Sequence, residues 1–89
     1  MANEFNPDWA THPGDHLKEY LEIRGMSLSD LSRATGLTKA YLSDLLKRRR
    51  SIGVKTALRL EQVFGLGADI WLNIQANWDL HEARGKGEV

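Results

Sequence analysis

The sequence predicts an all-α domain of five helices, and three observations support this prediction. Apolar residues recur at helical spacing through most of the chain. Both prolines, Pro7 and Pro13, lie near the N-terminus, so no later helix is interrupted by proline. No stretch of useful length alternates apolar and polar residues as a strand would. We expect an extended lead-in over residues 1–12, a helical domain over residues 13–83 and a flexible tail over residues 84–89.

Residues with special backbone or capping preferences mark the first two helices. Pro13 suits the first turn of a helix, where its missing N–H costs nothing. Gly25 suits the left-handed cap that ends this helix. Ser27 then opens a second helix and forms a capping-box-like pair with Asp30. Gly36 provides the next break, so the second helix is short.

The third helix completes a motif that has a functional meaning. We expect it over about residues 39–46, with Thr38 as its N-cap. Its inward-facing residues are Leu42, Leu45 and Leu46. Only the turn 36–38 separates it from the second helix. A helix, a short turn that contains glycine and a second helix form the helix-turn-helix signature.

A basic loop and two further helices follow. Gly53 stands where the fourth helix should be capped, and residues 65–67 separate that helix from the fifth, expected over residues 68–83. The fifth helix carries more large apolar residues than one stripe can hide. We expect four of them to face the core: Ile70, Trp71, Ile74 and Trp78.

Three other apolar residues of the fifth helix, Leu72, Ala76 and Leu80, are then left for another contact. We interpret them as the centre of a two-fold homodimer interface, because unpaired apolar patches usually mark interfaces. The alternative is that the N-terminal segment folds back through Phe5 and Trp9 and covers this face within one subunit.

The charge distribution points to a polyanionic partner although the net charge is zero. Residues 38–50 carry five basic residues and one acidic residue, whereas acidic residues are in excess on both sides of this segment. Four of the basic residues are consecutive, Lys47-Arg48-Arg49-Arg50. Local potential steers a polyanion more than net charge does, so the loop after the third helix is suited to DNA phosphates.

In a helix-turn-helix, the second helix of the motif enters the major groove, where exposed polar side chains read base edges. We therefore expect base contacts from four residues: Lys39, Ala40, Ser43 and Asp44. We expect contacts to the DNA backbone from six others: Thr38, Tyr41, Lys47, Arg48, Arg49 and Arg50. A protein-interaction module that uses the same fold without reading DNA is the competing interpretation.

Other classes of function have little support in the sequence. The chain has no cysteine, and His12 and His16 lack a second cluster, so we expect neither a metal site nor a cofactor. No nucleophile, histidine and carboxylate grouping suggests an enzyme. No apolar run is long enough to span a membrane, and no signal peptide precedes the domain, so the expected compartment is the cytoplasm.

Five segments resemble the HigA-type antitoxins, a branch of the lambda-repressor-like (Xre) helix-turn-helix proteins. They are His12-Pro13-Gly14, Met26 to Gly36, Leu42 to Leu45, Thr56 to Leu60 and Trp71 to Gln75. The resemblance implies a five-helix DNA-binding domain that dimerises on a palindromic operator in its own promoter. It also implies a RelE-like toxin as partner. A phage- or plasmid-related Xre regulator without a toxin is the alternative.

Overall fold

The computed structural model describes residues 10–85, and this part of the chain is all-α. Its five helices are α1 (Pro13–Arg24), α2 (Leu28–Thr35), α3 (Lys39–Leu46), α4 (Val54–Phe64) and α5 (Ala68–Gly85). The last helix continues two residues beyond the expected end at residue 83. The proposed N-terminal anchors Phe5 and Trp9 lie outside the described residues.

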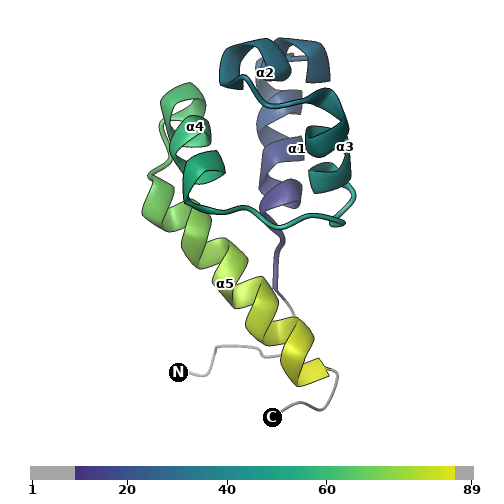
Figure 1. Ribbon diagram of the computed structural model, residues 1–89, viewed down its shortest axis with the longest axis vertical. Coiled ribbons are helices and arrows are strands. Elements are labelled where there is room, and N and C mark those ends of the chain that lie inside the picture. The colour runs from purple at the N-terminus through teal and green to yellow at the C-terminus, as the bar shows by residue number, and fades with distance from the viewer. Residues whose placement is uncertain (1–9, 86–89) are drawn as a thin grey trace.

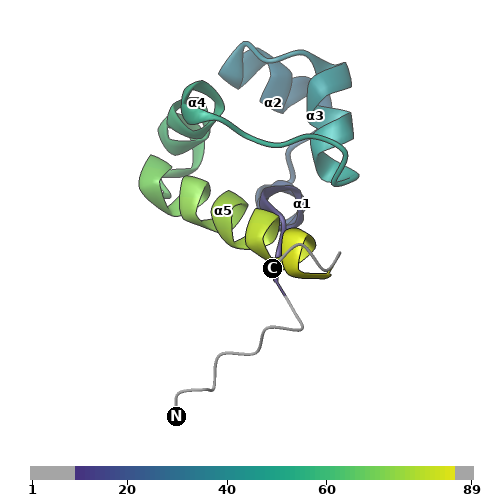
Figure 2. The same ribbon diagram turned by 60° about the horizontal axis from the view of Figure 1, so that its bottom comes forward.

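The helices surround one small core. α1 packs against α3 and α5, α2 packs against α3 and α4, and α4 packs along α5 (Figure 1). The connection between α3 and α4 crosses the width of the domain (Figure 2). The core consists of ten buried apolar residues: Leu17, Leu21, Leu31, Leu42, Leu45, Ile52, Ala57, Leu60, Phe64 and Trp71.

Local capping explains where the helices begin and end. Ser27 and Asp30 form the expected capping box, with both side chain–backbone hydrogen bonds at 3.0 Å. Thr38 caps α3 by accepting a hydrogen bond of 3.1 Å from the backbone N–H of Tyr41. Gly36 ends α2 with φ +76°, a left-handed conformation that favours glycine.

Two arginines cap helices far away in sequence. The Arg24 guanidinium donates to the last carbonyls of α4, those of Val63 at 3.0 Å and Phe64 at 3.4 Å. The Arg59 guanidinium donates to the carbonyl of Thr35 at the end of α2. Cations stabilise the negative ends of helix dipoles, so these side chains hold α1 to α4 and α4 to α2.

Gly14 permits the closest approach between two helices. A Cβ atom at this position would lie 2.0 Å from the backbone oxygen of Leu45 and 2.9 Å from its carbonyl carbon. The N-terminal turn of α1 therefore rests directly on the C-terminal turn of α3. This contact gives a physical reason for the Pro-Gly pair that opens α1.

α5 faces the core differently from the prediction. Trp71 is fully buried as expected, but Ile70 is 44% exposed, so its predicted core position is wrong. The buried face of α5 instead includes Gln75, which lies one turn after Trp71 and is only 5% exposed. Leu72, expected on a free outer surface, is half-buried and packs partly against the core. Of the proposed dimer residues, Leu80 is 50% exposed and Ala76 is exposed.

None of the helices in residues 10–85 is long and apolar enough to cross a membrane.

Candidate nucleic-acid interface

The turn between α2 and α3 is held by short polar contacts. The Ser32 hydroxyl donates to the carbonyl of Leu37 at 2.6 Å, and the N–H of Leu37 donates to the Thr35 hydroxyl at 3.2 Å. α2 and α3 pack against each other, and Leu31 of α2 and Leu42 of α3 are fully buried in the same core. The two helices are therefore fixed in one relative orientation, as a rigid reading unit requires.

The four proposed base-contact residues share one face of α3, because their spacing follows the helical repeat. Lys39 and Ala40 are exposed, and Ser43 and Asp44 are half-buried. The Lys39 ammonium donates to the Ser29 hydroxyl at 3.2 Å, a solvent-exposed contact. Asp44 lies 3.8 Å from the Arg50 guanidinium. This face thus offers a donor, a methyl group, a hydroxyl and an acceptor.

The structure gives Tyr41 an internal role. Its hydroxyl donates to the carbonyl of Ser51 at 3.0 Å and lies 3.1 Å from the Thr56 hydroxyl. A phosphate accepts hydrogen bonds but donates none, so this hydroxyl proton is already engaged when the loop is folded. Thr38 differs, because its hydroxyl oxygen accepts the capping bond and its proton remains available to a phosphate.

The four consecutive basic side chains are all exposed, but they do not act alike. Within residues 10–85, the side chains of Lys47 and Arg49 have no hydrogen-bond or ion-pair partner. Arg50 lies near Asp44 and 6.0 Å from the centre of the Tyr41 ring. Three cations thus face solvent beside the outer face of α3, at most loosely paired.

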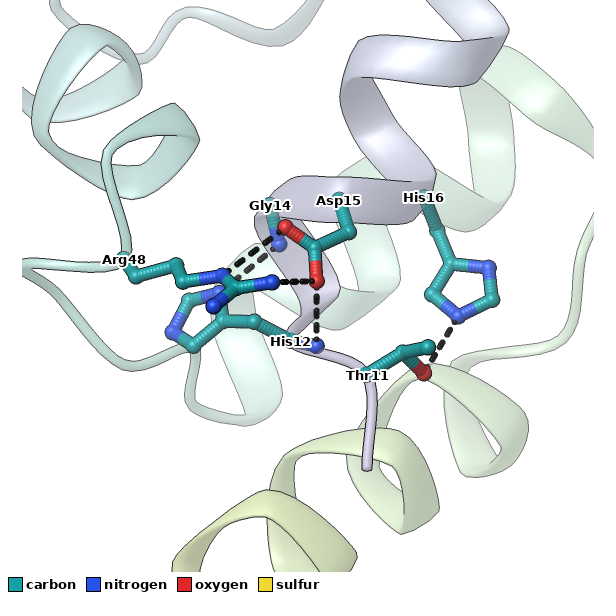
Figure 3. A network of polar contacts seen from close by, with 6 residues as sticks. All are labelled: Thr11, His12, Gly14, Asp15, His16 and Arg48. Carbon is teal, nitrogen blue, oxygen red and sulfur yellow. Dashed lines mark hydrogen bonds and ion pairs between the residues drawn. The ribbon is translucent and has the colours of Figure 1, made fainter. Parts of the chain in front are cut away.

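Arg48, which was predicted to contact the DNA backbone, is paired within the domain. Its guanidinium binds both carboxylate oxygens of Asp15, at 3.1 and 2.9 Å (Figure 3). It also lies 4.9 Å from the Trp78 ring centre. Its φ of +64° is left-handed, which in a non-glycine residue costs roughly 1–2 kcal/mol. With this backbone conformation, the side chain reaches the first turn of α1.

Asp15 and His12 complete the network around Arg48. Burial alone would raise the pKa of Asp15, but hydrogen bonds from Arg48 and from the His12 backbone N–H hold it below its ordinary value. The buried His12 ring caps α1, because its Nδ1 accepts from the Gly14 N–H at 2.9 Å. The same ring meets Trp78 edge-on at 5.3 Å.

The capping role of His12 was not predicted from the sequence, where His12 was weighed as a metal ligand and quoted in the segment His12-Pro13-Gly14. The signal was present, because His12 precedes Pro13 and stands three residues before an aspartate, the spacing of a capping box. His16 lies instead beside the Thr11 hydroxyl, 2.8 Å from its oxygen (Figure 3). Over residues 10–85, no group of three or more potential ligands is placed to hold a metal ion.

Gln75 is a second residue that the sequence analysis missed. Its side-chain oxygen accepts from the N–H of Ile52 at 2.9 Å, and its amide donates to Asp79 at 2.9 Å. Ile52 follows the basic loop and is itself buried. One buried amide thereby ties the end of this loop to α5. The sequence signal was its position four residues after Trp71, at the end of the segment Trp71 to Gln75 that resembles the HigA-type antitoxins.

Comparisons with known proteins agree with this arrangement. The helix-turn-helix family matches residues 17–71, so the chain belongs to that family. The chain is similar to virulence-associated protein I of Dichelobacter nodosus, with 39% identity over 83% of this chain and 69% of that protein.

Two solved structures share the fold. One is an addiction module antidote protein of the HigA family from Coxiella burnetii, with a TM-score of 0.82 and 34% identity over 88% of this chain and 86% of that one. The other is the antitoxin HigA of Pseudomonas aeruginosa with the higBA promoter, with a TM-score of 0.84 and 28% identity over 90% and 88% of the two chains. The structural neighbours thus include HigA-family antitoxins, and the five-helix, lambda-repressor-like fold is that of this branch.

Proposed function

We propose that this protein is a sequence-specific DNA-binding transcriptional repressor and the antitoxin of a HigB/RelE-type toxin–antitoxin module. It binds a palindromic operator in its own promoter as a homodimer. The observation that carries the proposal is the polar outer face of α3, flanked by the exposed cations Lys47, Arg49 and Arg50. The HigA neighbour solved with its promoter supports the same reading of the fold.

The DNA-binding part is tested with the DNA upstream of the protein's own gene and a random duplex of the same length. Three cations in each of two protomers give six phosphate contacts and a log–log salt slope of about −5. We expect Arg49→Ala to weaken both duplexes about equally. Lys39→Ala should cost about 1–3 kcal/mol on the operator and relax preference at one base position. A wild-type slope shallower than about −2 contradicts this use of the loop.

The dimer places two copies of α3 about one DNA turn apart, roughly 34–36 Å. We propose that the outer face of α5, with Ala76 and Leu80 near its centre and Leu72 at its edge, forms the two-fold contact. Leu80→Glu is the sharper test, because Leu72 also packs against the core. It should give a folded monomer in sedimentation and much weaker operator binding. Ile23→Glu, at another exposed apolar position, is the matched control.

The toxin partner is tested at the adjacent gene. We expect a small basic protein there whose expression arrests growth, and growth should recover when this protein is co-expressed. A neighbour without this effect favours the regulator that has no toxin. We expect Arg49→Ala to weaken DNA binding and to leave toxin binding unchanged, so this variant separates the two activities.

A further inference from the structure

Asp15 and Arg48 form the most completely paired charge contact beside the proposed DNA surface. The two residues are 33 positions apart in sequence, and two hydrogen bonds join them in bidentate geometry. Trp78 stacks on the same guanidinium from α5. The adjacent Lys47 and Arg49 have no such partner within the described part of the chain.

We propose that Asp15 masks Arg48, so that the basic loop presents three cations to DNA rather than four. This inference rests on the proposed DNA-binding function and adds an intramolecular limit to it. A phosphate is also a bidentate acceptor for arginine and competes with Asp15 for the same donors. To win this competition it must break two charge-assisted hydrogen bonds and leave the partly buried Asp15 carboxylate without its cation.

The local backbone favours the masked state. Arg48 lies two residues after the end of α3 and has a left-handed φ. The Arg48 backbone N–H donates to the Leu45 carbonyl at 3.1 Å. Gly14 rests on that same carbonyl, so Asp15, its chain neighbour, is held beside Arg48. A swing of Arg48 to the DNA therefore requires the loss of contacts with both α1 and α5.

The consequence is measurable as a salt dependence. Affinity falls with salt according to the number of phosphates that are neutralised, with a slope of about 0.9 per contact. Asp15→Asn removes the charge of the partner, while the amide oxygen can still accept from the His12 N–H. Release of Arg48 in both protomers should steepen the slope by about 2. Between 50 and 200 mM salt, this difference amounts to about a tenfold greater loss of affinity.

Three variants isolate the effect. Arg48→Ala should leave the wild-type slope unchanged, because a masked arginine contributes no phosphate contact. The double variant Asp15→Asn with Arg48→Ala should return to the wild-type slope. Asp69→Asn removes an equivalent charge from the first turn of α5 and is the matched control, with no steeper slope expected. Random duplex DNA is the probe, and thermal melts confirm that each variant is folded.

Each result decides the proposal. An unchanged slope for folded Asp15→Asn overturns it, and so does a shallower slope for Arg48→Ala, which would show that Arg48 contacts phosphate beside Asp15. If Asp15→Asn does not fold, the Arg48→Ala slope decides alone. If the wild-type protein and Arg49→Ala fail to bind any duplex, the proposed function itself falls. If Arg49→Ala weakens DNA binding but Asp15→Asn leaves the salt slope unchanged, the proposed function stands and only the masking of Arg48 by Asp15 is wrong.

Discussion

Substitution of Gly14 by alanine tests the contact between the start of α1 and the end of α3. The new methyl group would lie 2.0 Å from the Leu45 oxygen, where real Cβ contacts stay above 3.0 Å. Both obstructing atoms belong to the backbone, so no flexible side chain can move aside. The two helix ends must separate by about 1 Å, and the turn that leads into the basic loop moves with them.

The expected loss of stability follows from two opposing effects. Overpacking of a tight contact costs about 1–3 kcal/mol, and the backbone clash places this substitution near the upper end. The higher helix propensity of alanine returns at most about 1 kcal/mol. We expect a net loss of about 2 kcal/mol, which lowers the melting temperature of a domain of this size by about 8–16 °C.

Thermal and urea unfolding followed by circular dichroism measure this loss. Gly53→Ala is the control, because Gly53 has a negative φ and no atom within 4 Å of the added Cβ. It should cost less than about 1 kcal/mol, as expected for a weakened N-cap. Equal stability of Gly14→Ala and the wild-type protein would refute the close approach of the two helices.

Three further predictions concern capping and the buried amide. Burial lowers the pKa of His12, and the positive charge of Arg48 lowers it further, whereas the negative charges of Asp15 and Asp79 oppose this shift. As the pH falls, the His12 ring therefore takes up a proton more readily in the unfolded state than in the folded state. Unfolding free energy should therefore fall as pH drops below about 6.5, by at most about 1.4 kcal/mol per pH unit for this group; urea titrations should show a smaller fall for His12→Asn, and equal pH dependence would contradict the assignment. Gln75→Ala leaves the Ile52 N–H without its acceptor and should cost about 2–3 kcal/mol in urea unfolding, whereas Asn73→Ala, on the exposed face of α5, should cost little. Gly53→Ser should stabilise α4 by a few tenths of a kcal/mol in thermal melts, because the present cap has no side-chain hydrogen bond; a lower melting temperature would count against this geometry.

The helix limits were predictable because their causes are local. The capping pair Ser27 and Asp30, the cap Thr38 and the left-handed Gly36 each act within one turn of their own position. The predicted bounds of α3 agree with the structure for the same reason. Contacts of this kind depend on a few neighbouring residues, and a sequence displays such neighbours directly.

The orientation of α5 was harder to predict, because this helix carries apolar side chains on all of its faces. Periodicity could not decide between Ile70 and Gln75 for the inner face, and the polar residue occupies it. The reason is non-local, since Gln75 meets an N–H of the loop that precedes α4. A buried polar group is stable only with its partner, and that partner is 23 residues away in sequence.

The basic loop shows the same limit for the candidate site. Four consecutive cations are equivalent in a sequence, but only Arg48 takes a left-handed backbone and meets Asp15. The predicted exposure of Lys39 and Arg49 agrees with the structure. Their contacts with DNA remain predictions, as do the contacts of the other proposed reading residues.

The two tryptophans of α5 make the domain its own optical probe. Trp71 is fully buried, and within the described residues its indole N–H has no hydrogen-bond partner, so its fluorescence should be blue-shifted and report on the core. Trp78 is half-buried between the His12 ring and the Arg48 guanidinium, and its emission should respond when that guanidinium moves. With Trp9 replaced by phenylalanine, core melting and release of the loop can be recorded separately in one unlabelled protein.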